Sequence, residues 1–279
     1  MLVLALLHPV AVINWWRWSI HPSTVLGIAA LGVLYLWVAR RVEEKPTSLQ
    51  HGYFFSGLFV MFASLNGPIH DLSDGYLFSA HMVQHLVLTL LMPPLLLAGV
   101  PGSMLRPALR NRAVASIARF LTRPVACFVI FNVIIAAWHL PPLYNAAMAN
   151  HDIHILEHLM FMAGAVLMWW PLLSPLPELP RLAYPGQMLY SWLMTIPMSI
   201  TAVYIAMADS VLYPAYAAAP RILPLSPLED QLLGALIMWI PGGLVFVAVI
   251  SVIFFRWQAH GAEDSAASAQ VDWRPATGA

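Results

Sequence analysis

The sequence predicts an all-α protein, a polytopic membrane helix bundle of seven transmembrane helices formed by residues 1–256. Hydrophobic residues make up 60% of the 279-residue chain and charged residues only 9%, whereas about a quarter of the residues in a soluble domain are charged. The mean hydropathy is +0.74. The apolar residues fall into seven segments, each near the roughly 20 residues that cross a bilayer as a helix.

The seven segments follow one another with recognisable boundaries. The first ends before a basic stretch, the second is the shortest, and the third contains the adjacent prolines Pro93 and Pro94. The sixth and seventh contain Pro197 and Pro241, and because membrane helices tolerate proline we expect kinks at these positions. The expected spans are 22–40, 51–66, 77–100, 124–141, 153–173, 185–207 and 230–255. The remaining residues, 257–279, are rich in Ala, Ser and Gly and are expected to form a flexible cytoplasmic tail.

Lysine and arginine lie almost entirely on one side of this predicted topology. Of the 13 such residues, only Arg17 and Arg221 fall on the other side. Since cytoplasmic loops retain positive charge, we expect the N-terminus outside, the C-terminus in the cytoplasm, and a multi-pass protein of the inner (plasma) membrane. The arginine-rich segment 103–121 is expected to lie on the inner surface and contact membrane lipid. The zero net charge gives no reason to expect a nucleic-acid partner, and no oligomeric state follows from the sequence.

The histidines are distributed in the opposite way. Of the 11, only His51 and His260 fall on the predicted cytoplasmic side. At about 1.5 Å of rise per residue, five of the others are expected in the outer leaflet, at the ends of spans three, four and five. These five are His81, His85, His139, His154 and His158. Residues 81 and 85 share one helical face, as do residues 154 and 158.

These residue types in this pattern indicate a metal site near the extracytoplasmic face. Neutral imidazole is a common ligand of zinc, copper and haem iron, and a pair four residues apart can present two nitrogens to one ion. A supporting carboxylate fixes the tautomer of a ligand, a role for which Glu157 and Asp230 are candidates. Met92 and Met162 are candidate thioethers near the paired helices. Imidazole and thioether without thiolate favour copper, and Cys127 is the only cysteine.

Structural roles compete with metal binding for these side chains. Intramembrane ionisable groups are costly and by default functional, which favours the functional interpretation for His81 and His85. The other three histidines could instead bond to one another and to acidic residues such as Asp74, tying helices together without metal. For His70, near a predicted helix end, an interfacial hydrogen-bonding role is expected. Most methionines are expected to be core filler.

Several separate motifs resemble one protein family. They are "HMVQHLVLTLLMPPLLLAGVP", "AAWHLPPLYNAAMANHDIHILEHLMFMAGAVLMWWPLL", "LYPAY" and "LEDQLLGALIMWIPGG". In this order, between about residues 50 and 256, they resemble the CtaG-type cytochrome c oxidase assembly factors, a polytopic family associated with caa-type oxidases. The positions that match its motifs are His81, Gln84, His85, Pro93, Pro94, Trp138, His139, Pro141, Tyr144, His154, Glu157, His158, Asp230, Gln231, Met238 and Trp239.

The resemblance implies a role in maturing the haem–copper oxidase of a respiratory chain, with cytochrome c oxidase subunits as partners. Copper binding is a separate inference from ligand chemistry. The leading hypothesis is therefore a metallochaperone that is not an enzyme, holds copper through some of the five histidines and passes it to the oxidase.

Two other classes stay open at this stage. Histidine and aspartate near one membrane surface would also suit a seven-helix membrane zinc hydrolase, in which a metal-bound water attacks an amide or ester. Histidines on facing helices could alternatively ligate the iron of a haem. The metal found in the purified protein and its absorption spectrum separate these three hypotheses.

Overall fold

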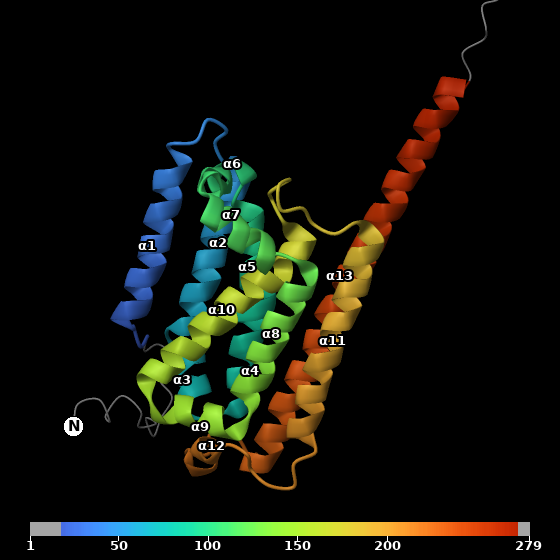
Figure 1. The fold of residues 1–279 in the computed structure, drawn as a ribbon. Helices are drawn as coiled ribbons and strands as arrows, with labels where there is room; N and C mark the ends of the chain where they lie inside the picture. Colours follow the sequence, from blue (N-terminus) through green and yellow to red (C-terminus); the bar gives the residue numbers. More distant parts are fainter. Residues whose placement is uncertain (1–17, 273–279) are drawn as a thin grey trace, which may run out of the picture.

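The structure is a computed structural model that describes residues 18–272, with side chains described for residues 18–261. Every regular element in this part of the chain is helical (Figure 1). Arg17 and residues 273–279, part of the expected tail, lie outside the described residues. The all-α prediction is confirmed.

Long helices run side by side to form the bundle, and short helices cover its two ends (Figure 1). The long helices are α1 (Pro22–Ala39), α2 (Ser48–Leu65), α8 (Pro124–His139), α10 (His151–Leu173), α11 (Tyr184–Ala206) and α13 (Pro227–Asp272), together with α4 (Phe78–Leu86) and α5 (Met92–Gly99), which a π-helix at Val87–Leu91 joins. The short ones are α3 (Pro68–Gly75), α6 (Gly102–Leu105), a 3-10 turn at Arg106–Arg110, α7 (Arg112–Leu121), α9 (Pro141–Ala149) and α12 (Pro214–Ala218).

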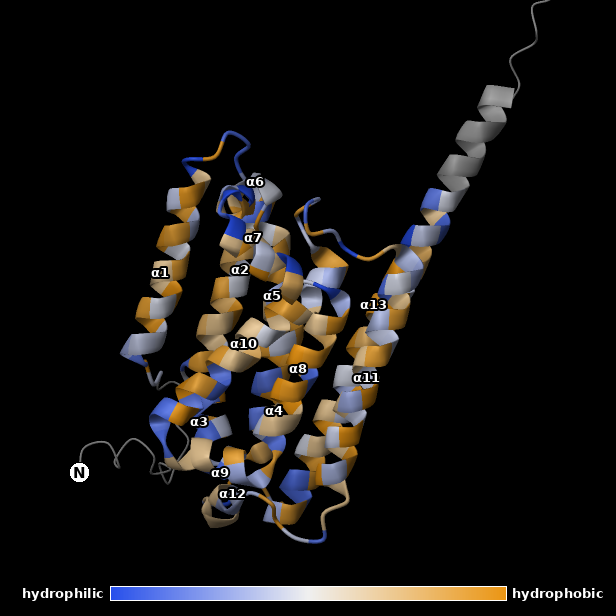
Figure 2. Ribbon diagram, in the orientation of Figure 1, coloured by the Kyte–Doolittle hydropathy of each residue, from blue (hydrophilic) through white to orange (hydrophobic). Residues whose placement is uncertain are grey.

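Five helices of the described chain are long and apolar enough to cross a membrane. They are Pro22–Ala39, Phe78–Gly99, His151–Leu173, Tyr184–Ala206 and Pro227–Gly261. Two further pairs pass the same test but are bent, α2 with α3 by 45° and α7 with α8 by 71°. Counting each bent pair as one span gives up to seven, so a helical membrane bundle is confirmed. In Figure 2 apolar residues cover most of the helical surface, while hydrophilic residues gather at the ends and around α3 and α4.

The adjacent prolines of the third span account for its π-helix. Pro93 and Pro94 lack the N–H groups that would bond the carbonyls of Thr89 and Leu90 in a regular helix. The Trp169 indole of α10 instead donates to the Thr89 carbonyl over 2.9 Å, and the Thr89 hydroxyl donates to the His85 carbonyl over 2.7 Å. The expected kink at the prolines is therefore a π-helical turn that fixes α10 against this span, directly after His85.

Two further features hold the bundle around that span. A Cβ at Gly99 would lie only 2.5 Å from the Phe54 backbone nitrogen, so glycine lets α5 pack closely on α2. On the other side, α13 packs along both α11 and α4. Helix α13 continues to Asp272, past residue 255, where the seventh span was expected to end. Alanine-rich sequence favours helix once a preceding helix supplies the nucleus.

Candidate metal centre

Helix α4 carries the first pair of histidines, and α13 holds its N-terminus in place. The Asp230 carboxylate accepts hydrogen bonds from the Phe78 N–H over 2.7 Å, the Ser79 N–H over 3.3 Å and the Ser79 hydroxyl. A buried carboxylate at this end satisfies N–H groups that the helix cannot and complements its dipole. His81 and His85 then project from one face, with ring centroids 4.0 Å apart.

Helix α10 supplies the second group of polar side chains. Asn150 is its N-cap: the side-chain oxygen of this residue accepts hydrogen bonds from the N–H groups of Asp152 and Ile153. One turn further on, His154 and His158 share a face, with ring centroids 4.6 Å apart. Glu157 lies beside them and is only 1% exposed.

The two helices bring their polar faces together inside the bundle. Three overlapping groups each place one potential ligand atom per residue within 4.8 Å of the others. The groups are Asp74, His81 and His154; His81, His85 and Glu157; and His154, Glu157 and His158. We call these six residues the histidine cluster. Four of the five histidines predicted from the sequence therefore lie close together. Glu157, which was expected only to support a histidine ligand, is itself a potential ligand.

The cluster holds buried nitrogen atoms that accept no hydrogen bond from the described part of the protein. Both nitrogens of His81 and His85, and Nε2 of His154 and His158, are buried without a partner, as is one Glu157 oxygen. His158 Nδ1 lies 3.1 Å from the His154 carbonyl; because a carbonyl only accepts, Nδ1 carries the proton and Nε2 keeps its lone pair. Buried polar groups are normally satisfied, so this concentration indicates a ligand site.

Asp74 enters the cluster through the bend between α2 and α3. Its Oδ2 lies 3.6 Å from His154 Nδ1 and 3.3 Å from His70 Nε2. On the other side of the His70 ring, the Gln84 amide nitrogen lies 3.2 Å from Nδ1. His70 thus has a polar neighbour at each nitrogen and positions Asp74, which agrees with the hydrogen-bonding role expected for it. From the sequence, Asp74 was expected as an acidic neighbour of the histidines that could hydrogen-bond to them or, in a zinc hydrolase, act as a general base or ligand.

Comparison with known proteins identifies the family. Residues 33–260 match the model of the family described as "Cytochrome c oxidase caa3 assembly factor". The chain belongs to this family. The description of the family names assembly of a caa3-type cytochrome c oxidase as its role.

Two curated relatives of this chain are uncharacterized proteins, one of Mycobacterium bovis and one of Mycobacterium tuberculosis. Each is 26% identical over 200 residues, which cover 65% of this chain and 30% of the relative. The match thus spans less than a third of the length of these relatives. No solved structure matches this chain.

Tyrosines from two separate family motifs cover the cluster. The Tyr216 hydroxyl of α12 donates to the Ser73 carbonyl over 2.7 Å and lies 2.9 Å from the Tyr144 hydroxyl of α9. Tyr213 donates to the His139 carbonyl over 2.9 Å. Burial raises the pKa of Tyr144 and Tyr216 well above the usual value, so both remain protonated donors. "LYPAY" therefore places a lid of phenols over His81, whose ring lies 5.3 Å from Tyr144.

Other residues predicted for the site lie outside the cluster. His139 belongs to none of the three groups, although its ring lies 6.4 Å from that of His85. Asp230 supports α4 through backbone and hydroxyl groups rather than by fixing an imidazole tautomer. Met92 is a core residue of a separate apolar cluster with Leu88, and Met162 packs against that cluster. Helical spacing alone does not show which face of a span turns toward a neighbouring helix. The sequence therefore could not show which of these residues lie in the cluster and which lie outside it.

Proposed function

We propose that this chain is an assembly factor for cytochrome c oxidase, which binds copper as its cargo at the histidine cluster and passes it to a subunit of the oxidase. The observation that carries the proposal is the set of three overlapping ligand groups, in which every residue except the partly exposed Asp74 is buried and each group contains unpartnered imidazole nitrogens. Imidazole binds copper well, and a set of alternative ligands within 4.8 Å lets an ion move between neighbouring positions rather than being locked in one. The protein acts without catalysing a reaction.

The proposed topology has seven spans in the plasma membrane, with the histidine cluster near the extracytoplasmic face. The basic residues that follow α1 and those in α7 lie at one end of the bundle, whereas α3, α9 and the start of α4 lie at the other (Figure 1). Positive charge marks the cytoplasmic side. The N-terminus is then outside, and copper reaches the cluster from the compartment outside the membrane.

The experiment compares copper content with oxidase activity. We expect the double variant His81→Ala, His85→Ala to accumulate in the membrane but to lose most of its bound copper, with oxidase activity in those membranes falling at least tenfold. His260→Ala is the matched control, because this histidine is exposed at the opposite end of α13. Normal oxidase activity in the double variant would remove the histidine cluster from the function.

A membrane zinc hydrolase is the second candidate, favoured by the carboxylates. His81, His85 and Glu157 form a two-histidine, one-carboxylate set of the kind that holds catalytic zinc, and Asp74 is a further acid close by. Metal analysis and an absorption spectrum of the purified chain separate the candidates. Copper without a Soret band supports the proposal, zinc supports the hydrolase, and a Soret band indicates haem.

A further inference from the structure

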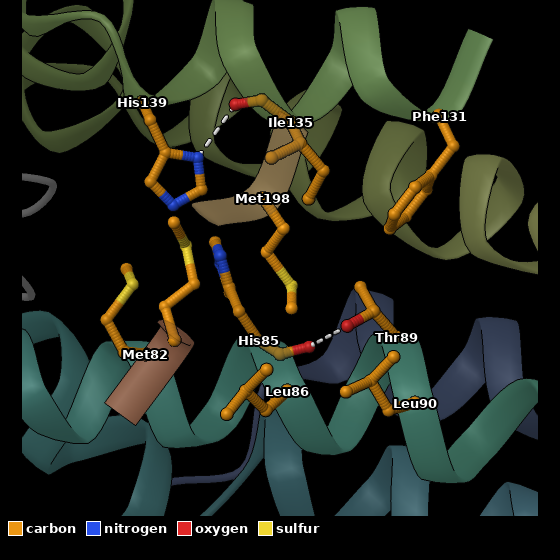
Figure 3. Close-up of a pocket in the computed structure, with 10 residues that line it drawn as sticks. Met82, His85, Leu86, Thr89, Leu90, Phe131, Ile135, His139 and Met198 are labelled. Carbon is orange, nitrogen blue, oxygen red and sulfur yellow. Dashed lines mark hydrogen bonds between the residues drawn. The ribbon is translucent and has the colours of Figure 1, made fainter. Parts of the chain in front are cut away.

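A small cavity beside the histidine cluster is lined by a different set of donor atoms. It lies between α4, α8, α11 and α13, and its lining includes Met82, Met198 and Met238 together with His85 and His139. We call these five residues the thioether pocket. All five are buried. In Figure 3 the side chains of Met82 and Met198 flank the space between the two imidazoles.

The two imidazoles of the thioether pocket have nitrogens free to bind an ion. His139 Nδ1 lies 2.7 Å from the Ile135 carbonyl, so Nδ1 carries the proton and Nε2 keeps its lone pair. That Nε2 and both His85 nitrogens are buried, and the described residues offer them no hydrogen-bond partner. The edge of the His139 ring that carries Nε2 faces the side chain of His85 across the cavity (Figure 3). A ring separation of 6.4 Å is close to the roughly 6 Å expected when one ion binds about 2 Å from a nitrogen of each ring.

The lining of the pocket distinguishes it from the histidine cluster. The cluster combines imidazole with the carboxylates Asp74 and Glu157, whereas neither an acid nor a thiol is among the described residues that line the pocket. Neutral thioether and imidazole ligands favour a soft, singly charged ion such as Cu(I). Neutral ligands would leave the second positive charge of a divalent ion uncompensated in this apolar pocket, which is energetically costly.

We infer that the thioether pocket is a second metal site, which binds Cu(I) through His139, His85 and the methionine thioethers. The inference rests on the proposed function in one respect, because it takes copper as the cargo. His85 belongs to both sites and can turn between them, since neither of its nitrogens has a partner among the described residues. Copper that enters at the carboxylate-containing cluster then reaches a pocket selective for its reduced form.

Ordinary packing is the competing explanation for the methionines, since thioethers commonly fill cores. Met61 and Met104 show that role in this chain, because both are buried in apolar clusters that contain none of the five pocket residues. They provide a matched control for substitutions of the pocket methionines.

The test measures binding of Ag(I), a stand-in for Cu(I) without redox chemistry, and of Zn(II) to the purified full-length chain in detergent. Leucine conserves methionine volume, so Met198→Leu, Met238→Leu should fold while losing one equivalent of Ag(I), or weakening its binding at least tenfold. Zn(II) binding should stay unchanged. Met61→Leu, Met104→Leu should bind both ions as the wild type does.

A second double variant separates this inference from the proposed function. His81→Ala, His154→Ala should lose Zn(II) binding yet keep the Ag(I) equivalent of the pocket. Wild-type Ag(I) binding by the Met198, Met238 variant overturns the pocket. If instead the His81, His154 variant keeps every bound ion, the proposed function fails while the pocket stands.

X-ray absorption supplies a readout that does not depend on the folding of the methionine variants. In Cu(I)-loaded Cys127→Ser protein, any sulfur ligand must be a thioether because Cys127 is the only cysteine. Sulfur neighbours in this spectrum support the pocket, and a shell of nitrogen and oxygen alone overturns it.

Discussion

Trp169 of α10 donates its indole N–H to the backbone carbonyl of Thr89, 2.9 Å away and 80 residues earlier in the chain. The carbonyl is available because Pro93, four residues later, has no N–H to offer it. One proline thus converts a helical hydrogen bond into a contact between helices. It joins the two elements that carry the histidine cluster, at a position one turn beyond His85.

Trp169→Phe should destabilise the protein through this contact. Phenylalanine keeps most of the buried apolar surface but leaves the Thr89 carbonyl without its donor, which costs about 1–3 kcal/mol. Thermal unfolding in detergent should show a lower midpoint. Trp192→Phe is the control, because Trp192 is 54% exposed and its replacement should leave the midpoint unchanged. Equal midpoints for both variants would contradict the role of the indole.

Asp230→Asn should loosen α4. The carboxylate accepts two backbone N–H groups and the Ser79 hydroxyl, and an amide loses the charge and one acceptor oxygen. We expect a loss of about 1–3 kcal/mol in unfolding free energy and weaker metal binding by His81. Glu229→Gln is the matched control: its carboxylate accepts the Ser226 N–H over 2.7 Å at the exposed start of α13, where glutamine serves equally well. A Glu229→Gln variant as unstable as Asp230→Asn would show that the effect is not specific to α4.

The sequence predicted those parts of the site that depend on spacing within one helix. His81 with His85, and His154 with His158, each share a face because four residues complete about one turn. The two pairs also lie at similar depth, since each opens its span. Hydropathy likewise predicted the helical bundle. These features are local, and composition and periodicity determine them.

The parts that the sequence did not predict depend on how helices are turned against one another. Asp74 joins the cluster because α2 and α3 bend by 45°, and Asp230 reaches Phe78 across 152 residues. Met92 was expected near the site, whereas Met82 and Met238 line the cavity beside His85. The π-helix at Val87–Leu91 lies between Met82 and Met92. Because its turn contains more residues than an α-helical turn, the two methionines point in directions that regular helical spacing does not predict.

Tyr216→Phe should open the lid of phenols above the cluster. The substitution leaves the Ser73 carbonyl without its donor at 2.7 Å and the Tyr144 hydroxyl without its partner at 2.9 Å. We expect bound copper to exchange at least threefold faster with a chelator in stopped-flow measurements, at a stability cost of about 1–3 kcal/mol. Tyr204→Phe serves as control, because Tyr204 is 46% exposed. Unchanged exchange in Tyr216→Phe would show that copper leaves by another route.

Copper binding should depend on pH with a defined sign. Only neutral imidazole binds a metal ion, so protons compete with copper once the pH falls below the pKa of the ligand histidines. Copper then stabilises the folded chain above that pKa, and the stabilisation is lost on acidification. The measurement is the difference in unfolding midpoint with and without copper between pH 5 and pH 8. The His81→Ala, His85→Ala variant should show little difference at any pH, and a copper-induced stabilisation as large as that of the wild type in this variant would exclude these two histidines as ligands.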